Sequence, residues 1–351
     1  MSAECCPQNP ILYLLRSYGD NGGRYNALKI LPHLDRCMVA FILGARRIGK
    51  TDLFLRLACD LYQQFGLKTM WMRNKDVELT DPSFYGDFLN DAKLFKWCPE
   101  SWEARADGVH VSPDKDSDIA IKFQAVSTFS NRRGGAHPDV ELIIMDEIMP
   151  EDRRYPKRCA TGLLSITMTV FNGRPTARLF CLSNFTEATN PYFVKYRIFP
   201  GRNQDVTVFN DKRMLIERCN GYVRSVEDGN PWADVYKAAR VGMYEREDED
   251  PMMALIKRTP KGAKPAPYLI VSDGQQYRYW LKDNLVYWSE FKGASDGIVR
   301  YTPNLNECTD TVKLMPNMLR RDIQVCLENG VLRFNTPNTM YAILSCCYTE
   351  V

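Results

Sequence analysis

The residues best suited to chemistry form one glycine-rich segment with the sequence GARRIGKT, residues 44–51. It matches the complete P-loop pattern, G-x-x-x-x-G-K-[ST]. In this pattern the glycines let successive backbone N–H groups face phosphate oxygens, while the lysine adds a positive charge and the hydroxyl binds Mg²⁺. The sequence therefore predicts a site for ATP and Mg²⁺. The predicted nucleotide-binding residues of this segment are Gly44, Arg47, Gly49, Lys50 and Thr51.

A second chemical signal is the acidic pair Asp146-Glu147, which ends the apolar run VELIIMDE. After a P-loop, such a pair is expected to divide two tasks. Asp146 holds the Mg²⁺ shell, and Glu147 orients and deprotonates the attacking water. Acidic pairs are common after strands, so this interpretation depends on the P-loop. Together the two motifs indicate a hydrolase rather than a protein that only binds nucleotide.

Polar side chains also follow the run ARLFCLSN, which ends in Ser183 and Asn184. Ligands of α/β sheets lie at the carboxyl ends of strands, so these side chains could sense the γ-phosphate or the attacking water. The alternative is a capped turn that leads into NPYF.

Four arginines are further candidates for the site. Arg174, in the loop FNGRPTAR, is expected one strand away from the nucleotide edge, where it could stabilise phosphoryl charge, in trans if the protein forms rings. Arg73, at the end of MWMR, could contact phosphate or Glu147 and act as a switch. Arg132 and Arg133, in SNRRGGAHP, suit a basic loop that reaches a neighbouring subunit or DNA phosphate. Ordinary solvated charge is the alternative for each.

These motifs lie on a regular succession of strands and helices. The run RCMVAFILG suits a strand buried on both faces, and TDLFLRLACDLYQQFG has leucines at helical spacing and closes at Gly66. Further strands are predicted at LKTMWMR, DIAIKFQAVST, VELIIMDE and ARLFCLSN. Their alternation with helical stretches predicts a parallel, helix-covered sheet across about residues 30–200.

After residue 200 the alternation of predicted strands and helices ends. Helical patterns and the acidic run EREDED lead into RTPKGAKPAP, which reads as a linker. Beyond it, two or three strands are separated by turns at Asp273-Gly274 and Asp283-Asn284, and the helix LMPNMLRRDIQVCLENG precedes a Cys-rich strand or tail. We therefore predict an α/β ATPase domain over 1–203, a linker subdomain over 204–266 and a small α+β domain over 267–351.

The composition is that of a globular protein with 351 residues, of which 45% are hydrophobic and 25% charged. A formal charge of +3 requires any contact with nucleic acid to use local patches. The 12 cysteines form no CxxC pair and sit mostly in apolar runs, which favours core positions in a reducing compartment over disulfides or zinc. We expect no membrane segment, because no apolar run has the length of a span.

Taken together, four segments resemble the DNA-packaging ATPases of phi-29-like podophages in order and spacing. They are FILGARRIGKT, LIIMDE, FCLSNFTEATNPYF and MLRRDIQVCLENGVLRFN. The resemblance covers the ATPase half well and the C-terminal part thinly. It implies an ASCE-type P-loop ATPase core related to terminase large subunits, joined through a linker domain to a degenerate RNase H-like domain.

The resemblance also implies partners and a place of action. Family members form a homo-oligomeric ring, typically a pentamer, on the portal, or connector, of an empty prohead, in one case docked on a structural packaging RNA. The expected location is the host cytoplasm, with transient residence at the portal vertex.

Carried over by position, the family roles agree with those inferred from the motifs. Thr51 and Asp146 would bind the metal, Glu147 the water, and Ser183 with Asn184 would be the coupling motif. The arginine-finger loop aligns with FNGRPTAR, but one gapless alignment puts Asn172 at the expected arginine and leaves Arg174 as the nearest substitute. A family residue that reaches across subunits falls near Arg133.

We expect the C-terminal domain to lack nuclease activity, because Asp273 and Asp283 sit at apparent hairpin turns, where Asp is favoured locally. Metal-dependent plasmid cleavage that disappears in Asp273→Ala would overturn this. The domain is expected to dock the ring to portal, capsid or RNA. Candidate polyanion contacts are Lys257, Arg258, Lys261, Lys264, Arg320 and Arg321.

The function that these observations favour is an ATP-hydrolysing motor that translocates double-stranded viral DNA into an empty prohead. Two alternatives remain open at this level. One is a terminase large subunit with an active C-terminal nuclease, and the other is a P-loop ATPase switch that does not act on DNA.

Overall fold

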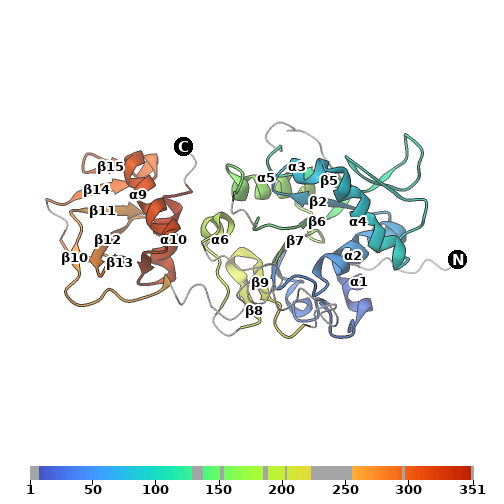
Figure 1. The fold of residues 1–351 in the computed structure, drawn as a ribbon, viewed down its shortest axis with the longest axis horizontal. Helices are drawn as coiled ribbons and strands as arrows, with labels where there is room; N and C mark the ends of the chain where they lie inside the picture. Colours follow the sequence, from blue (N-terminus) through green and yellow to red (C-terminus); the bar gives the residue numbers. More distant parts are fainter. Residues whose placement is uncertain are drawn as a thin grey trace, which may run out of the picture. The chain divides into compact units, whose positions relative to one another are not determined.

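The computed structural model describes residues 8–128, 137–150, 154–184, 189–201, 204–222, 255–294 and 297–348. The chain forms two compact units (Figure 1). The first comprises Met1–Thr186 and Phe199–Glu247, and the second comprises Glu187–Ile198 and Asp248–Val351. The chain therefore enters the second unit, returns to the first and leaves it again.

The first unit is built on a nine-stranded sheet in the order β3-β4-β5-β2-β6-β7-β1-β9-β8. Six neighbouring strands, from β5 to β9 in this order, pair in parallel, and antiparallel strands complete both edges. The strands are β1 (Val39–Leu43), β2 (Lys68–Arg73), β3 (Glu103–Arg105), β4 (Gly108–His110), β5 (Ile119–Ala125), β6 (Val140–Met145), β7 (Arg178–Ser183), β8 (Val206–Phe209) and β9 (Met214–Arg218).

Helices cover this sheet, and its central strands β1, β6 and β7 are buried at every position. Alternate side chains such as Ile42, Ile144 and Phe180 pack into one core with helices α1 and α2. The helix α5 contacts β6. The predicted parallel, helix-covered sheet is confirmed. The helices are α1 (Pro10–Tyr18), α2 (Lys50–Phe65), α3 (Val77–Thr80), α4 (Pro82–Leu94) and α5 (Cys159–Phe171), with short 3-10 helices η1 (Leu31–His33) and η3 (Asn210–Lys212).

Strands β8 and β9 lie within the range 204–266 that we expected to form a linker subdomain. Strand β9 instead pairs in parallel with β1, with Val39 opposite Met214. Its first four residues are buried, so an apolar strand completes the first sheet here rather than starting a linker. The remaining domain boundaries stay predictions.

The second unit holds a seven-stranded sheet in the order β15-β14-β11-β12-β13-β16, with β10 paired to β12. Both predicted turns, Asp273-Gly274 and Asp283-Asn284, have positive φ at each residue, as two-residue hairpins require. The strands are β10 (Lys264–Pro265), β11 (Tyr268–Ser272), β12 (Gln275–Lys282), β13 (Leu285–Glu290), β14 (Val299–Thr302), β15 (Val312–Leu314) and β16 (Leu332–Phe334). The helices are α6 (Pro191–Tyr196), η5 (Leu305–Glu307), α9 (Asn317–Glu328) and α10 (Pro337–Ser345).

The prediction of a Cys-rich strand or tail at the C-terminus is wrong for residues 337–345, which form helix α10. Thr336 caps this helix, because its side chain accepts a hydrogen bond of 3.1 Å from the backbone N–H of Thr339. Pro337 occupies the first turn, where its missing N–H costs nothing. Met340, Ile343 and Leu344 are fully buried, so the helix contributes an apolar face to the second unit.

The NPYF sequence forms helix α6 of the second unit. Asn190 caps it by accepting a hydrogen bond of 2.9 Å from the N–H of Phe193. The Tyr341 hydroxyl of α10 donates to the carbonyl of Ile198 just beyond α6, at 2.6 Å. The chain therefore passes from β7, through α6, back to β8 of the first unit.

The cysteines behave largely as small core residues. Those that are buried are Cys37, Cys59, Cys98, Cys159, Cys181, Cys219 and Cys346. Cys5 and Cys6 lie outside the described residues. Over the described ranges, no helix combines the length and apolar character that crossing a bilayer would require.

The Thr336 cap can be tested by substitution. Thr336→Ala removes the acceptor for the first-turn N–H and should lower the free energy of unfolding by about 1 kcal/mol. Thr336→Ser keeps the hydroxyl and should change it little. Chemical denaturation of the full chain measures both, and equal effects of the two substitutions would contradict the assignment.

Candidate active site

The glycine-rich segment joins the buried strand β1 directly to helix α2. Gly44 must be glycine, because a Cβ there would lie 2.5 Å from Cβ of Cys219. Gly49 has φ of 95°, a left-handed conformation that glycine adopts without strain. The segment thus turns tightly and places Lys50 and Thr51 in the first turn of α2, as predicted.

Lys50 is almost completely buried, with 4% of its surface exposed. Its Nζ donates hydrogen bonds of 2.8 Å to the carbonyls of Gly44 and Ala45, and lies 3.4 Å from Oδ1 of Asn184. Burial lowers the pKa of Lys50 to about 8, although the Asp146 carboxylate opposes this shift. The lysine charge is therefore held inside the loop, where a phosphate would meet it.

The acidic pair stands at the carboxyl end of β6. Asp146 is 5% exposed, and its backbone N–H donates to the carbonyl of Met72 on the adjacent strand. Glu147 has φ of 50°, a strained conformation for a residue with a side chain. The Asn74 side chain stabilises this turn by donating to the backbone carbonyls of Glu147 and Ile148, at 3.0 and 3.1 Å.

Arg73, at the end of the neighbouring strand β2, contacts both acids. Its Nη2 donates to Oδ2 of Asp146 at 2.9 Å, and its Nη1 donates to Oε2 of Glu147. Burial acts to lower the pKa of Arg73, but the two carboxylates outweigh it and raise the pKa. The predicted contact between Arg73 and Glu147 is present, and Arg73 balances the charge of both acids.

Ser183 and Asn184 end strand β7 beside the P-loop. The carbonyl of Ser183 accepts a hydrogen bond of 3.2 Å from the N–H of Gly44, and Asn184 faces Lys50 as described. The structure therefore brings together the ends of β1, β6 and β7, which the sequence had predicted to share one edge. Their role in coupling stays a prediction.

Arg174 does not stand near this edge of its own chain, so the expected position one strand away is wrong, whereas its role as an arginine finger in trans stays a prediction. Its guanidinium donates to the backbone carbonyls of His137, Pro138 and Val140 and forms an ion pair of 3.3 Å with Glu141. These partners precede or begin β6, whereas the acidic pair follows its other end. The left-handed Asn172 ends α5 and turns the chain, so that Arg174 anchors the amino end of the sheet.

The other predicted basic residues fall into two groups. Arg47 is exposed on the P-loop, whereas Arg132 and Arg133 lie outside the described residues. In the second unit, the polyanion candidates are exposed except Arg320, which is half-buried and donates to the carbonyl of Pro303 at 3.2 Å.

The two aspartates considered for nuclease chemistry both have left-handed turn conformations, with φ of 51° for Asp273 and 53° for Asp283. Asp273 also forms an ion pair with Arg197. Turn formation therefore accounts for the position of both residues, and the absence of nuclease activity stays a prediction.

Sequence reasoning missed a group of residues that support the P-loop from outside. Arg24 pairs with Asp52 of α2, and its Nε would lie 3.1 Å from a Cβ at Gly49. The next residue, Tyr25, donates its N–H to the carbonyl of Ile48 and its hydroxyl to the buried Glu217, at 2.8 Å each. No motif marks these residues, because the loop NGGRYN reaches the P-loop only in the folded chain.

Glu217 is buried on β9, next to β1. Burial raises its pKa to about 7, although hydrogen bonds from the Tyr25 and Tyr222 hydroxyls oppose the shift. The helical pattern predicted for this stretch is wrong at residues 214–218, which form β9, and the sequence carried no signal for a buried acid.

Comparison with known proteins agrees with these features. The family model of the podovirus DNA encapsidation protein (Gp16) matches residues 20–336. The DNA packaging protein of Bacillus phage phi29 is 27% identical over 331 residues, which cover 89% of this chain and 93% of the relative. That of Bacillus phage B103 is 30% identical over 316 residues, 84% of this chain and 92% of the relative. The solved Phi-28 gp11 DNA packaging motor shares the fold, with a TM-score of 0.71 at 16% identity over 94% of this chain and 99% of that one.

The buried lysine predicts a pH dependence of nucleotide binding. Without nucleotide, the Lys50 ammonium is fully present below its pKa of about 8 and is lost as the pH rises through that value. Phosphate favours the charged form, so the affinity for ATP should fall by about tenfold between pH 7 and pH 9. Titration with a fluorescent ATP analogue at both pH values measures this. Lys50→Ala should show no ATP binding at either pH, and a flat profile in the unsubstituted protein would exclude the mechanism.

Proposed function

The chain belongs to the podovirus DNA encapsidation protein (Gp16) family, and on that premise we propose that it is an ATP-hydrolysing motor that drives double-stranded viral DNA into an empty prohead. One observation carries the ATPase part of the proposal. The buried Lys50, the acids Asp146 and Glu147, and Asn184 meet at one edge of a parallel sheet. This arrangement fits the hydrolysis of a phosphoanhydride.

Each residue of this edge has a distinct task in the proposal. The N–H groups of the P-loop and Lys50 bind the β- and γ-phosphates of ATP. Glu147 orients a water molecule and accepts its proton as the oxygen attacks the γ-phosphorus. The bond between this phosphorus and the β,γ-bridging oxygen breaks, and ADP and phosphate are the products. Asn184 touches Lys50 and can respond to loss of the γ-phosphate, which makes the Ser183-Asn184 end of β7 the coupling element.

The residues at this edge also fit a magnesium ion. The Thr51 hydroxyl, exposed at the start of α2, and the Asp146 carboxylate are oxygen donors of the kind Mg²⁺ prefers. When bound, the ion would supply positive charge that neutralises the phosphates. Asp146 would hold the ion with the carboxylate that now accepts a hydrogen bond from Arg73.

We assign Arg73 the role of a switch. While its guanidinium holds Glu147, that carboxylate is paired and is a poor proton acceptor. Movement of Arg73 away from Glu147 would release the base for catalysis. DNA binding is the proposed trigger, so that ATP is consumed only when DNA is present.

The assembly part of the proposal rests on family membership. We propose a homo-oligomeric ring that acts at the portal vertex of the prohead in the host cytoplasm. The proposed ring is a pentamer, as is typical of the family that the sequence resembles. Contacts to DNA should use phosphates rather than bases, because the motor must move any sequence. Arg132 and Arg133 are proposed trans-acting or DNA contacts, and a structural packaging RNA is a further proposed partner.

The decisive experiment is ATP-dependent uptake of DNA by purified proheads, scored as DNA protected from added nuclease. Protection that requires both ATP and this protein supports the motor. If no DNA is protected and neither DNA nor proheads change the ATPase rate, the result would instead support a P-loop ATPase that acts as a signalling switch and not on DNA.

Two substitutions separate binding from hydrolysis. Lys50→Ala should abolish ATP binding, because the loop loses its positive charge. Glu147→Gln should bind ATP normally but reduce turnover by at least about 100-fold, because the amide cannot accept a proton. Nucleotide titration and steady-state phosphate release measure the two effects. Normal turnover by Glu147→Gln would refute its assignment as the base.

A third substitution tests the switch. Arg73→Ala should leave Glu147 unpaired without DNA, so that stimulation of the ATPase by DNA falls toward onefold. Arg16→Ala is the matched control, because Arg16 forms an exposed ion pair with Asp35, with 61% of the Arg16 side chain accessible. Stimulation equal to that of the unsubstituted protein in Arg73→Ala would exclude the switch.

A further inference from the structure

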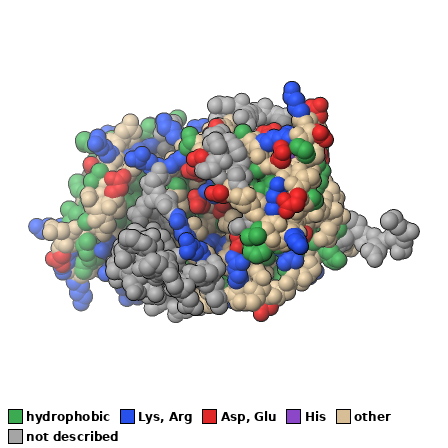
Figure 2. All heavy atoms as spheres, turned by 45° about the vertical axis from the view of Figure 1, so that its right-hand side comes forward, with side chains coloured by type: hydrophobic (Ala, Val, Ile, Leu, Met, Phe, Trp, Pro, Cys, Tyr) green, Lys and Arg blue, Asp and Glu red, His purple; other side chains and the backbone are tan. Residues whose placement is uncertain are grey.

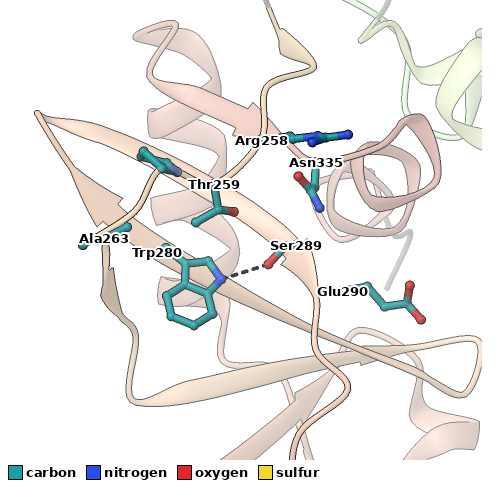
Figure 3. Close-up of a pocket in the computed structure, with 9 residues that line it drawn as sticks. Arg258, Thr259, Ala263, Trp280, Ser289, Glu290 and Asn335 are labelled. Atoms are coloured by element: carbon teal, nitrogen blue, oxygen red, sulfur yellow. Dashed lines mark hydrogen bonds between the residues drawn. The ribbon is translucent and has the colours of Figure 1, made fainter.

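The second unit contains a pocket of about 410 Å³ that plays no part in the proposed ATPase. Strands β12 and β13 provide Trp280, Ser289 and Glu290 (Figure 3). The chain before β10 provides Arg258, Thr259, Pro260, Gly262 and Ala263. Asn335, directly after β16, completes the lining. An aromatic ring and several polar side chains therefore line one pocket.

Trp280 is held in a fixed orientation. Its Nε1 donates a hydrogen bond of 2.9 Å to Oγ of Ser289 on the neighbouring strand, which Figure 3 shows as a dashed line. The Arg278 guanidinium lies 5.6 Å from the centre of the ring and donates to the carbonyl of Ala266. Because the N–H is satisfied within the protein, the indole offers the pocket an apolar, π-rich surface.

The polar residues around the ring can recognise the edge of a flat heterocycle. The Glu290 carboxylate accepts hydrogen bonds, and the Asn335 carboxamide both donates and accepts them. The Thr259 hydroxyl oxygen is buried and has no hydrogen-bond partner within the described residues. Such a group is unfavourable unless a ligand or water supplies the missing partner.

Positive charge surrounds the entrance on the side of β10. Four of the eight residues 257–264 are Lys or Arg, and all four are exposed. Figure 2 shows Lys and Arg side chains interspersed with apolar ones on the visible face of the molecule. A ligand that brings a negative charge beside its ring would be favoured over a neutral aromatic group.

We propose that this pocket binds an unpaired nucleobase whose phosphate lies on the basic segment. The base stacks on Trp280, its edge bonds to Glu290, Asn335 or Thr259, and its phosphate contacts Arg258 and Lys261. A free nucleotide and a single-stranded polynucleotide share this chemistry. Intact duplex DNA does not fit, because its bases are stacked inside the helix and present no free face.

The binding experiment uses the full chain with Lys50→Ala, which removes competition from the ATP site. A fluorescein-labelled single-stranded RNA of about ten nucleotides is the probe, and single-stranded DNA, duplex DNA, AMP and GMP are competitors. Competition by the mononucleotides identifies a free nucleotide as the ligand. Competition by single strands alone identifies a polynucleotide. Competition by duplex DNA as strong as that by single strands would overturn the proposal.

Variants locate the binding within the unit. Trp280→Ala should weaken binding at least about tenfold, because stacking on an aromatic side chain contributes that much per base. Trp280→Phe should retain most of the affinity, and Arg258→Ala should weaken it several-fold. Lys313→Ala is the control, because Lys313 is an exposed basic residue of β15 outside the pocket, and it should leave the affinity for the probe unchanged.

Two further measurements distinguish loss of the pocket from loss of folding. In the chain with Lys50 intact, Trp280→Ala should leave the basal ATPase rate unchanged. A 5-bromouridine probe, cross-linked by light and digested, should form its adduct on the peptide that contains Trp280. An adduct elsewhere, or unchanged affinity in Trp280→Ala, would refute the pocket as a nucleobase site.

Discussion

The buried ammonium of Lys50 is the constraint on which the first unit depends. A charge with 4% exposure must be compensated locally, and here two P-loop carbonyls, Asn184 and the nearby Asp146 do so. These partners come from the ends of β1, β7 and β6, which are adjacent and parallel in the sheet. The strand order therefore determines whether the lysine can be buried at all. The buried strands hold the residues at their carboxyl ends beside Lys50.

Arg73 extends the same charge balance to the proposed catalytic acid. It pairs with Asp146 and Glu147 together, so one guanidinium serves both carboxylates at the edge of the sheet. The phosphates of ATP would upset this balance and favour a rearrangement of the ion pairs. Sensing of nucleotide and control of the base are then two aspects of one electrostatic network.

The connection from β7 gives this network a direct route to the second unit. Only a short segment separates Asn184 from helix α6, whose cap and neighbouring Tyr341 contact belong to the second unit. The chain then returns to β8 and β9 beside the P-loop strand. The proposed coupling element at the end of β7 is therefore continuous in sequence with a segment of the second unit.

The sequence alone determined the P-loop, the acidic pair, the strands that carry them and both hairpin turns, because each depends on short-range patterns such as glycine spacing and apolar runs. The tertiary structure alone decided the rest. It joined Arg24, Tyr25 and Glu217 to the P-loop, turned the C-terminal cysteine-rich segment into a capped helix, and put Arg174 at the opposite end of the sheet. The physical reason is that a side chain's partners depend on which elements pack beside it, and residues such as Tyr25 and Glu217 meet across 192 positions of sequence that no local pattern can relate.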